Sequence, residues 1–525
     1  MFSLRATFLA LLAWLAQPER LKLRLFLEGN LIGVLTGLVV AAFRYLLVCS
    51  EEILPRLYAW LAQAPWEFPA LWLLALAGIG YIIYRILEAE PMTSGSGIPQ
   101  IEGILAGEMQ MNWARVLALK FAGAVLGIGA GLSLGREGPS VQLGACLGQG
   151  VGRLARRAPG EDRYLLTAGA GAGLAAAFNA PLAGVIFCLE ELTKDFSPLV
   201  LMGAVAASVT ATTVTQEFFG LAPVFHMGEV PVVATGAFFL PLVLLGAFVG
   251  VLSLAFNRTL TASLDGFQRL PLPERAKPVV PLFASCAAGF FLPQILGGGS
   301  PLVDSLVRED YGLLFLLVLF LGKFFFTMLC FGSGVPGGIF LPMLVLGSVG
   351  GAVFAKIAIF FHWMPELFAV NCIVFGMAAY FSAVVKSPIT GSVLIMEMTG
   401  SFEHMLALII VSMTAYLVSD LTGGEPVYDM LLSKSLAVRD KIARRIRHRR
   451  ILLEVSVGVK SALDGAVVAQ AGWPSGCVLV NVRRGPQELA PRDELRLQSG
   501  DALFVLTDAD DTAALQGLAA EHPDQ

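Results

Sequence analysis

Two charged residues, Arg136 and Glu137, lie in the middle of the otherwise small and apolar stretch "GIGAGLSLGREGPSVQLGACLG", residues 127–148. A charge at bilayer depth is costly, and ionisable residues found there usually serve a site. Glu137 is followed by Gly138 and Pro139, which suit the start of a helix better than its interior. Glu137 is therefore the first candidate for a functional carboxylate, and we interpret Arg136 as its structural partner.

Four short motifs combine glycine and proline where a helix would begin: "GSGIP" (95–99), "GREGP" (135–139), "GGIFLP" (337–342) and "GGEPVY" (423–428). Glycine lets backbone N–H groups turn toward a ligand, and a helix N-terminus carries unpaired donors and partial positive charge. Four such termini directed at one point would bind an anion without a lysine, and the hydroxyls of Ser96 and Tyr428 could donate to the same anion. Any one motif could equally be a kink for helix packing. The four together favour the anion site.

The elements that must position these motifs are membrane helices. The chain of 525 residues is 56% hydrophobic and 14% charged, with a mean hydropathy of +0.73, whereas soluble proteins carry about 25% charged residues. Spans of about 20 apolar residues are expected at 24–48, 232–256 and 312–330. Segments such as 165–178, 181–189 and 388–396 are short or interrupted. Broken helices of this kind are typical of a transporter core.

The sequence also repeats itself after about 203 residues. The segment that begins at Lys120 matches the segment that begins at Lys323 in its Gly and Pro positions. Two further blocks match in the same order: "GSGIP" with "GGGSP" (297–301), and Pro181, Gly184 and Glu190 with Pro388, Gly391 and Glu397. Matching interruptions in two halves indicate a pseudo-two-fold core with a binding site between the halves.

Two acids are present in the first half only. Phe340 occupies the place of Glu137 in the second half, and Met398 occupies the place of Glu191. Because the rest of the scaffold is shared, we expect these two acids to carry a function of their own.

Other kinds of site fit poorly. The seven cysteines and five histidines are scattered, so we expect no disulfide framework, no metal and no cofactor. "GLSLG" (131–135) fits a hydrolase pattern without partner residues, and "GAGAG" (169–173) lacks the strand of a dinucleotide loop. The run 433–450 holds eight Lys and Arg, which indicates a cytoplasmic flank rather than a nucleic-acid site.

At these motifs the sequence resembles the CLC family of chloride channels and chloride/proton antiporters. The likeness includes "FNAPLAGVIFCLEEL" (178–192) and "LIMEMTG" (394–400) and covers about residues 20–430. It implies an all-α polytopic membrane protein with the CLC fold, built from two inverted-topology repeats with broken helices. It also implies a homodimer in membrane lipid, with one pore in each subunit.

The resemblance also assigns roles to single residues. Glu137 would be the gate and proton acceptor, and Glu191 the inner proton-transfer residue. Chloride would be bound by the hydroxyls of Ser96 and Tyr428 and by the backbone amides of Ile339 and Phe340. Glu190, the counterpart of Glu397, is expected to be structural. Gln100 stands where family members often have Glu.

The expected activity is the exchange of chloride for protons, because Glu191 is present and a channel needs no inner acid. A passive chloride channel is the alternative. A fluoride/proton antiporter is less favoured, because fluoride exporters of this fold alter the serine of "GSGIP" and Ser96 is present. A membrane enzyme is also less favoured, and we expect no enzymatic activity.

Four regions are expected along the chain. Residues 1–23 form an interfacial or first helix, with a signal peptide at 1–16 as the alternative. Residues 24–430 form the transport domain and residues 431–450 a basic linker, and the fourth region follows at 451–525.

Residues 451–525, with strands at 451–457, 477–485 and 501–508 and a helix at 508–520, resemble the TrkA-C domain. That resemblance implies a small dimeric α/β regulatory module with a nucleotide as its suggested ligand; an inert cap is the alternative. The expected location is a bacterial inner membrane with both termini in the cytoplasm, and the basic run 433–450 supports the cytoplasmic side for the C-terminal region.

Overall fold

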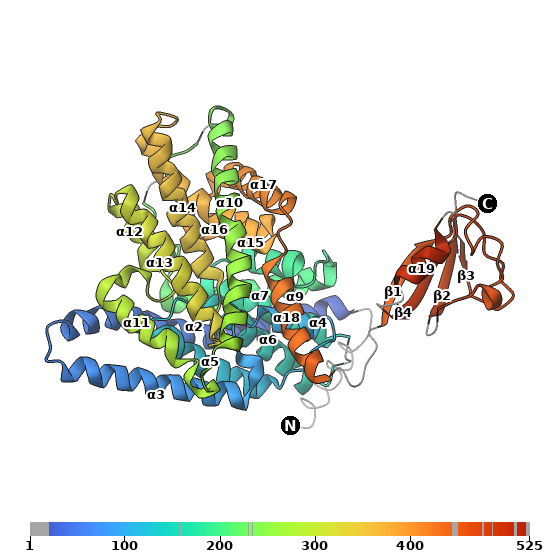
Figure 1. Ribbon diagram of the computed structural model, residues 1–525, viewed down its shortest axis with the longest axis horizontal. Coiled ribbons are helices and arrows are strands. Elements are labelled where there is room, and N and C mark those ends of the chain that lie inside the picture. Colours follow the sequence, from blue (N-terminus) through green and yellow to red (C-terminus); the bar gives the residue numbers. More distant parts are fainter. Residues whose placement is uncertain are drawn as a thin grey trace, which may run out of the picture. The chain divides into compact units, whose positions relative to one another are not determined.

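The computed structural model describes residues 20–157, 160–228, 230–233, 235–443, 450–474, 477–485, 487–508 and 512–520. Most of the predicted N-terminal helix (1–23) and residues 444–449 of the basic linker therefore lie outside the described residues. The chain divides into two compact units, Met1–Ser433 and Lys434–Gln525, each with a hydrophobic core of its own. Figure 1 follows both units along the chain.

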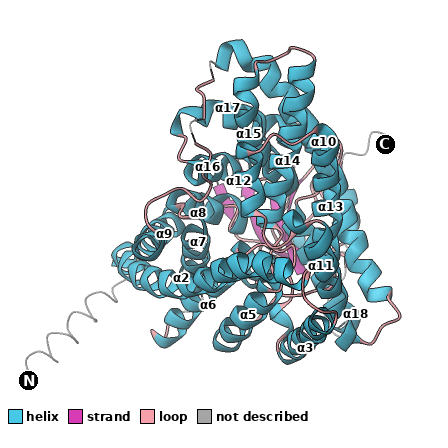
Figure 2. Ribbon diagram, turned by 90° about the vertical axis from the view of Figure 1, so that its left-hand side faces the viewer, coloured by secondary structure: helices cyan, strands magenta, loops and turns pink. Residues whose placement is uncertain are grey.

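The first unit is helical throughout its described part (Figure 2). Its helices are α2 (Leu21–Leu61), α3 (Glu67–Ala89), α4 (Ile98–Leu105), α5 (Trp113–Gly129), α6 (Glu137–Leu154), α7 (Asp162–Phe178), α8 (Pro181–Phe187), α9 (Pro198–Phe219), α10 (Thr235–Arg269), α11 (Val279–Phe291), α12 (Ser300–Arg308), α13 (Leu313–Gly332), α14 (Phe340–Phe360), α15 (Ala369–Val385), α16 (Pro388–Thr399), α17 (Met405–Leu421) and α18 (Val427–Ala443). Within the described ranges, eight helices are long and apolar enough to cross a membrane. The expected span 24–48 lies within α2, and the spans 232–256 and 312–330 begin three residues and one residue before α10 and α13; α2 and α10 are longer than predicted, with 41 and 35 residues.

The internal repeat is present in the backbone itself. Gly97 and Gly299, which precede α4 and α12, have φ angles of 99° and 98°. Gly131 and Gly334, which precede the N-termini of α6 and α14, have φ angles of 91° and 76°. Residues with a side chain rarely adopt this left-handed conformation. The repeated glycines therefore give both halves the same turn before each short or central helix.

Backbone hydrogen bonds join the glycine loops of the two halves. The N–H of Gly135 donates to the carbonyl of Gly338 at 2.6 Å, and the N–H of Gly338 donates to the carbonyl of Gly135 at 2.8 Å. The N–H of Gly337 also donates to the carbonyl of Gly95 at 2.9 Å. These bonds hold the starts of α6 and α14 next to each other, with the loop that leads into α4 beside them.

The two halves also cap each other's short helices. The Glu190 carboxylate accepts hydrogen bonds from the N–H groups of Ile389 and Thr390, at 3.1 and 2.6 Å, in the first turn of α16. The Glu397 carboxylate accepts from the N–H groups of Leu182 and Ala183, at 3.1 and 2.8 Å, in the first turn of α8. An acid stabilises the unpaired donors of a helix N-terminus. These contacts agree with the structural role expected for Glu190.

The second unit contains a four-stranded antiparallel sheet in the order β1-β4-β2-β3. Its elements are β1 (Arg450–Ser456), β2 (Val478–Arg484), β3 (Gln487–Leu489), β4 (Ala502–Asp508) and helix α19 (Thr512–Ala519). The three predicted strands are present within one residue at each end. Strand β3 was not expected, because three residues are too few for an alternating pattern to be recognised.

Candidate anion and proton site

Glu137 is the first residue of α6, and its side chain is fully buried. No hydrogen bond of normal geometry reaches either carboxylate oxygen from the described residues, but the backbone N–H groups of Glu137 itself and of Leu341 lie close enough to stabilise the carboxylate. The guanidinium of Arg136 is the nearest recorded cation, with Nε 3.8 Å from Oε1. Burying a polar group without hydrogen bonds is costly, and the amides of Glu137 and Leu341 at the starts of α6 and α14 are donors that can offset part of that cost.

Close backbone packing surrounds the Glu137 carboxylate. A Cβ atom at Gly135 would collide with Oε2 of Glu137 and would lie 3.0 Å from the amide nitrogen of Leu341. The Glu137 carboxylate and the Leu341 amide, in the first turn of α14, therefore both lie next to Gly135. A Cβ atom at Gly138 would collide with the Ser96 hydroxyl. The starts of α4, α6 and α14 thus meet at Glu137.

Ser96 and Tyr428 place two hydroxyl groups in the interior. Both side chains are buried, and neither hydroxyl has a hydrogen-bond partner within the described part of the chain. Tyr428 is the second residue of α18 and lies within electrostatic range of Glu191, Glu102 and Glu137. Two of the predicted chloride-binding groups are therefore buried donors without a protein acceptor.

Ile339 and Phe340 stand at the start of α14, as the N-cap and the first helical residue. Both are fully buried, and the Phe340 ring packs against Phe178 and Phe381, with centroid distances of 5.3 and 4.5 Å. The family resemblance predicts the amides of these two residues as chloride donors, and the structure adds the amide of Leu341 as a further candidate, beside the Glu137 carboxylate. Pro342 could have indicated the Leu341 amide from the sequence alone. Proline has no N–H group, so the N–H of Leu341 is the last free backbone donor of the motif.

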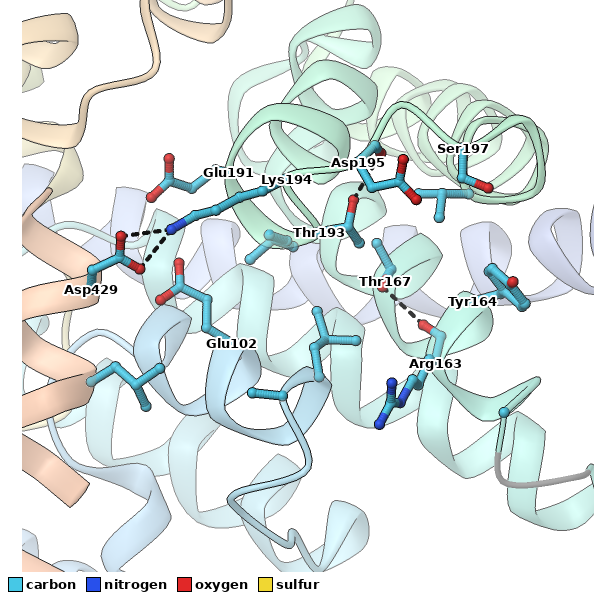
Figure 3. A pocket seen from close by; sticks show the side chains of 16 residues that line it. Glu102, Arg163, Tyr164, Thr167, Glu191, Thr193, Lys194, Asp195, Ser197 and Asp429 are labelled. Carbon is cyan, nitrogen blue, oxygen red and sulfur yellow. Dashed lines mark hydrogen bonds and ion pairs between the residues drawn. The ribbon is translucent and has the colours of Figure 1, made fainter. Parts of the chain in front are cut away.

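Glu191 lies in a π-helical turn, Cys188–Leu192, directly after α8. Its side chain is 3% exposed, and the Ser387 hydroxyl donates a hydrogen bond to Oε2. Glu191 also lines a cavity of about 520 Å³, which we call the inner cavity. Figure 3 shows Glu191, Glu102, Lys194 and Asp429 grouped at one end of this cavity. A buried acid beside a polar cavity can exchange protons with water there.

Two neighbouring polar residues on α4 differ in their contacts. The Gln100 side chain donates to the carbonyl of Ser94 at 2.8 Å, which supports the loop that carries Ser96. Glu102 is buried and lines the inner cavity, and its carboxylate oxygens have no hydrogen-bond partner among the described residues. Among those residues no group of three or more His, Cys, Asp or Glu side chains is placed so that it could hold a metal ion.

Comparisons with known proteins match both units. Residues 75–420 match the voltage gated chloride channel family, and residues 452–519 match the TrkA-C domain. The chain is 39% identical to the H(+)/Cl(-) exchange transporter ClcA of Vibrio cholerae over 77% of this chain and 88% of the relative. It is 36% identical to ClcA of Citrobacter koseri over 81% of this chain and 92% of the relative.

Two solved structures share the fold. A slow cyanobacterial Cl-/H+ antiporter superposes with a TM-score of 0.74 at 32% identity and covers 79% of this chain and 98% of its own. A CLC-type fluoride/proton antiporter superposes with a TM-score of 0.64 at 25% identity and covers 77% of this chain and 97% of its own.

Proposed function

This chain is a multi-pass membrane protein of the voltage gated chloride channel (CLC) family with a TrkA-C domain, and we propose that it exchanges chloride for protons. The observation that carries the proposal is the pair of buried acids. Glu137 lies where three helix N-termini meet, beside the Leu341 amide, and Glu191 lies beside the inner cavity. The relatives named as H(+)/Cl(-) exchange transporters support the same activity.

In the proposed mechanism, chloride and the Glu137 carboxylate compete for one anion seat. The seat consists of the Ser96 and Tyr428 hydroxyls and the amides at the start of α14, at Ile339, Phe340 and Leu341. Ionised Glu137 occupies the seat and closes the path, because helix N-termini attract a carboxylate. Protonated Glu137 has no charge to hold it there and yields to chloride. Glu191 passes protons between the inner cavity and Glu137.

Two features bear on the alternatives. A passive channel needs no inner acid, whereas Glu191 is buried and hydrogen-bonded by Ser387. Fluoride is less favoured than chloride because Ser96 is present in the first glycine motif. We further propose a homodimer in a bacterial inner membrane, with both termini in the cytoplasm and the TrkA-C domain as a regulatory module whose suggested ligand is a nucleotide.

The deciding experiment measures chloride and proton movement together in sealed liposomes that contain the purified protein. An exchanger drives protons uphill when only a chloride gradient is imposed. Chloride flux without any uphill proton movement would favour the channel, and the absence of both fluxes in folded protein would reject the proposal.

A further inference from the structure

An ion pair spans part of the inner cavity. Lys194 Nζ lies 2.6 Å from each carboxylate oxygen of Asp429 (Figure 3). The side chains are 50% and 43% exposed, so the pair faces water. Lys194 has a φ of 51°, a conformation that is unfavourable for a residue with a side chain and persists where the surrounding structure holds it.

The pair joins two segments that the proposed mechanism uses. Lys194 follows Glu191 by three residues, in the loop after the π-helical turn, and Asp429 directly follows Tyr428 in the first turn of α18. The charges of Lys194 and Asp429 both act on Glu191 and on Glu102. A change in the charge of Lys194 or Asp429 would therefore affect both Glu191, the proposed proton carrier, and the region around Tyr428, the proposed chloride-binding residue.

The Lys194–Asp429 pair matters because of the other charged side chains that line the inner cavity. Four carboxylates and two cations line it: Glu102, Glu191, Asp195, Asp429, Arg163 and Lys194. An anion that enters such a cavity is repelled by every ionised carboxylate without a partner. Lys194 cancels the charge of Asp429, and loss of Lys194 would leave that charge beside the two buried acids.

We propose that the Lys194–Asp429 ion pair sets the access of chloride to the inner cavity by charge compensation. The inference rests on the proposed function in taking chloride as the anion. Lys194 and Asp429 are positioning residues, since neither has to touch the bound chloride. One uncompensated charge in water should change the half-saturating chloride concentration by about threefold to fivefold at low salt.

The test compares Lys194→Gln, Asp429→Asn and the double variant in full-length protein. The half-saturating chloride concentration is measured by flux into liposomes and by calorimetric chloride binding in detergent. We expect it to rise in Lys194→Gln, to fall in Asp429→Asn and to return near the wild-type value in the double variant. Raising sodium gluconate from about 10 mM to about 300 mM should shrink both shifts, because it screens exposed charges.

Lys356→Gln is the control. Lys356 forms an ion pair of the same residue types with Asp310, and neither residue lines the inner cavity. The control should leave the half-saturating chloride concentration unchanged. The charge-swapped variant, Lys194→Asp with Asp429→Lys, keeps the experiment informative if a single variant fails to fold, and it should bind chloride like the wild type.

Shifts in the same direction in both single variants, or shifts that persist at high salt, would overturn the proposal and indicate a mechanical link to α18. Unchanged chloride dependence in both would also overturn it. Calorimetry separates this inference from the proposed function, because chloride binding can shift in opposite directions even in a protein that moves no protons.

Discussion

Lys120 and Lys323 make the same contact in the two halves of the membrane unit. Lys120 Nζ donates to the carbonyl oxygens of Thr93 and Gly95 at 3.0 and 2.6 Å. Lys323 Nζ donates to those of Ile295 and Gly297 at 3.0 and 2.7 Å. Both lysines are fully buried. Each lysine therefore links a long helix to the glycine loop that precedes a short helix. It does so by donating hydrogen bonds to backbone carbonyl oxygens.

Lys120→Met should destabilise the protein by about 1–3 kcal/mol, because it leaves the Thr93 carbonyl unpaired and removes one of the two donors to the Gly95 carbonyl. The change is measured as a lower apparent melting temperature of the detergent-solubilised protein, and Lys323→Met should behave alike. Normal thermal stability with lost chloride binding would instead make Lys120 part of the anion seat.

Glu137→Gln should transport chloride without coupled protons. Glutamine has nearly the same shape but cannot carry a charge into the seat or release a proton. The measurement is a chloride-driven proton uptake assay in liposomes, with chloride release from the same vesicles as the control. Uphill proton pumping by this variant would contradict the assignment of Glu137.

Glu191→Gln should keep chloride transport and reduce proton flux to background, because the carrier next to the inner cavity is lost. Glu190→Gln is the matched neighbour. It changes the cap of α16 and should cost about 1 kcal/mol of stability while the ratio of chloride to protons stays the same. Unchanged coupling in Glu191→Gln would move the role to Glu102, which lines the same cavity.

Bromide soaked into crystals should give an anomalous peak among Ser96, Tyr428 and the amides at the start of α14. These groups are buried donors that a halide can accept from. Ser96→Ala and Tyr428→Phe should each weaken the peak. A strong peak elsewhere, with none at this point, would contradict the proposed seat.

Much of the architecture was predictable because it depends on local backbone requirements. The glycines at 97 and 299 have nearly equal φ angles, and the spacing of such glycines made the repeat visible. The contacts of the site were less predictable. The bonds from Ser387 to Glu191 and from Lys194 to Asp429 join residues 196 and 235 positions apart in sequence, and periodicity carries no information on which distant side chains meet.

The C-terminal unit should lose stability in acid through one carboxylate. Asp501 is buried and bonded by the Arg484 guanidinium, with two contacts of 2.8 Å. The hydrogen bonds from Arg484 hold the pKa of Asp501 below its usual 3.8. Because the folded pKa is depressed, this stabilisation is complete at neutral pH and is lost as the pH falls below about 4.

Asp501→Asn should remove that acid sensitivity and cost about 2 kcal/mol at neutral pH, since the Arg484 charge loses its partner. Hydrogen exchange of peptides from β4 in the full-length protein reports both effects. The Arg483–Glu454 pair is the control, because both its side chains are about half exposed, and Glu454→Gln should change little. Equal acid sensitivity in wild type and Asp501→Asn would contradict this explanation.

The exchanged helix caps bear on how such a chain could have arisen. Glu190 completes α16 and Glu397 completes α8, so each half supplies the acid that the other half lacks at its own short helix. A single half standing alone would leave that helix start without its carboxylate, unless a second copy donated one in trans. Reciprocal donation is therefore the arrangement expected if a gene for a self-pairing half-sized ancestor was duplicated and fused. It also means that the start of one short helix in each half is completed only when the other half is present.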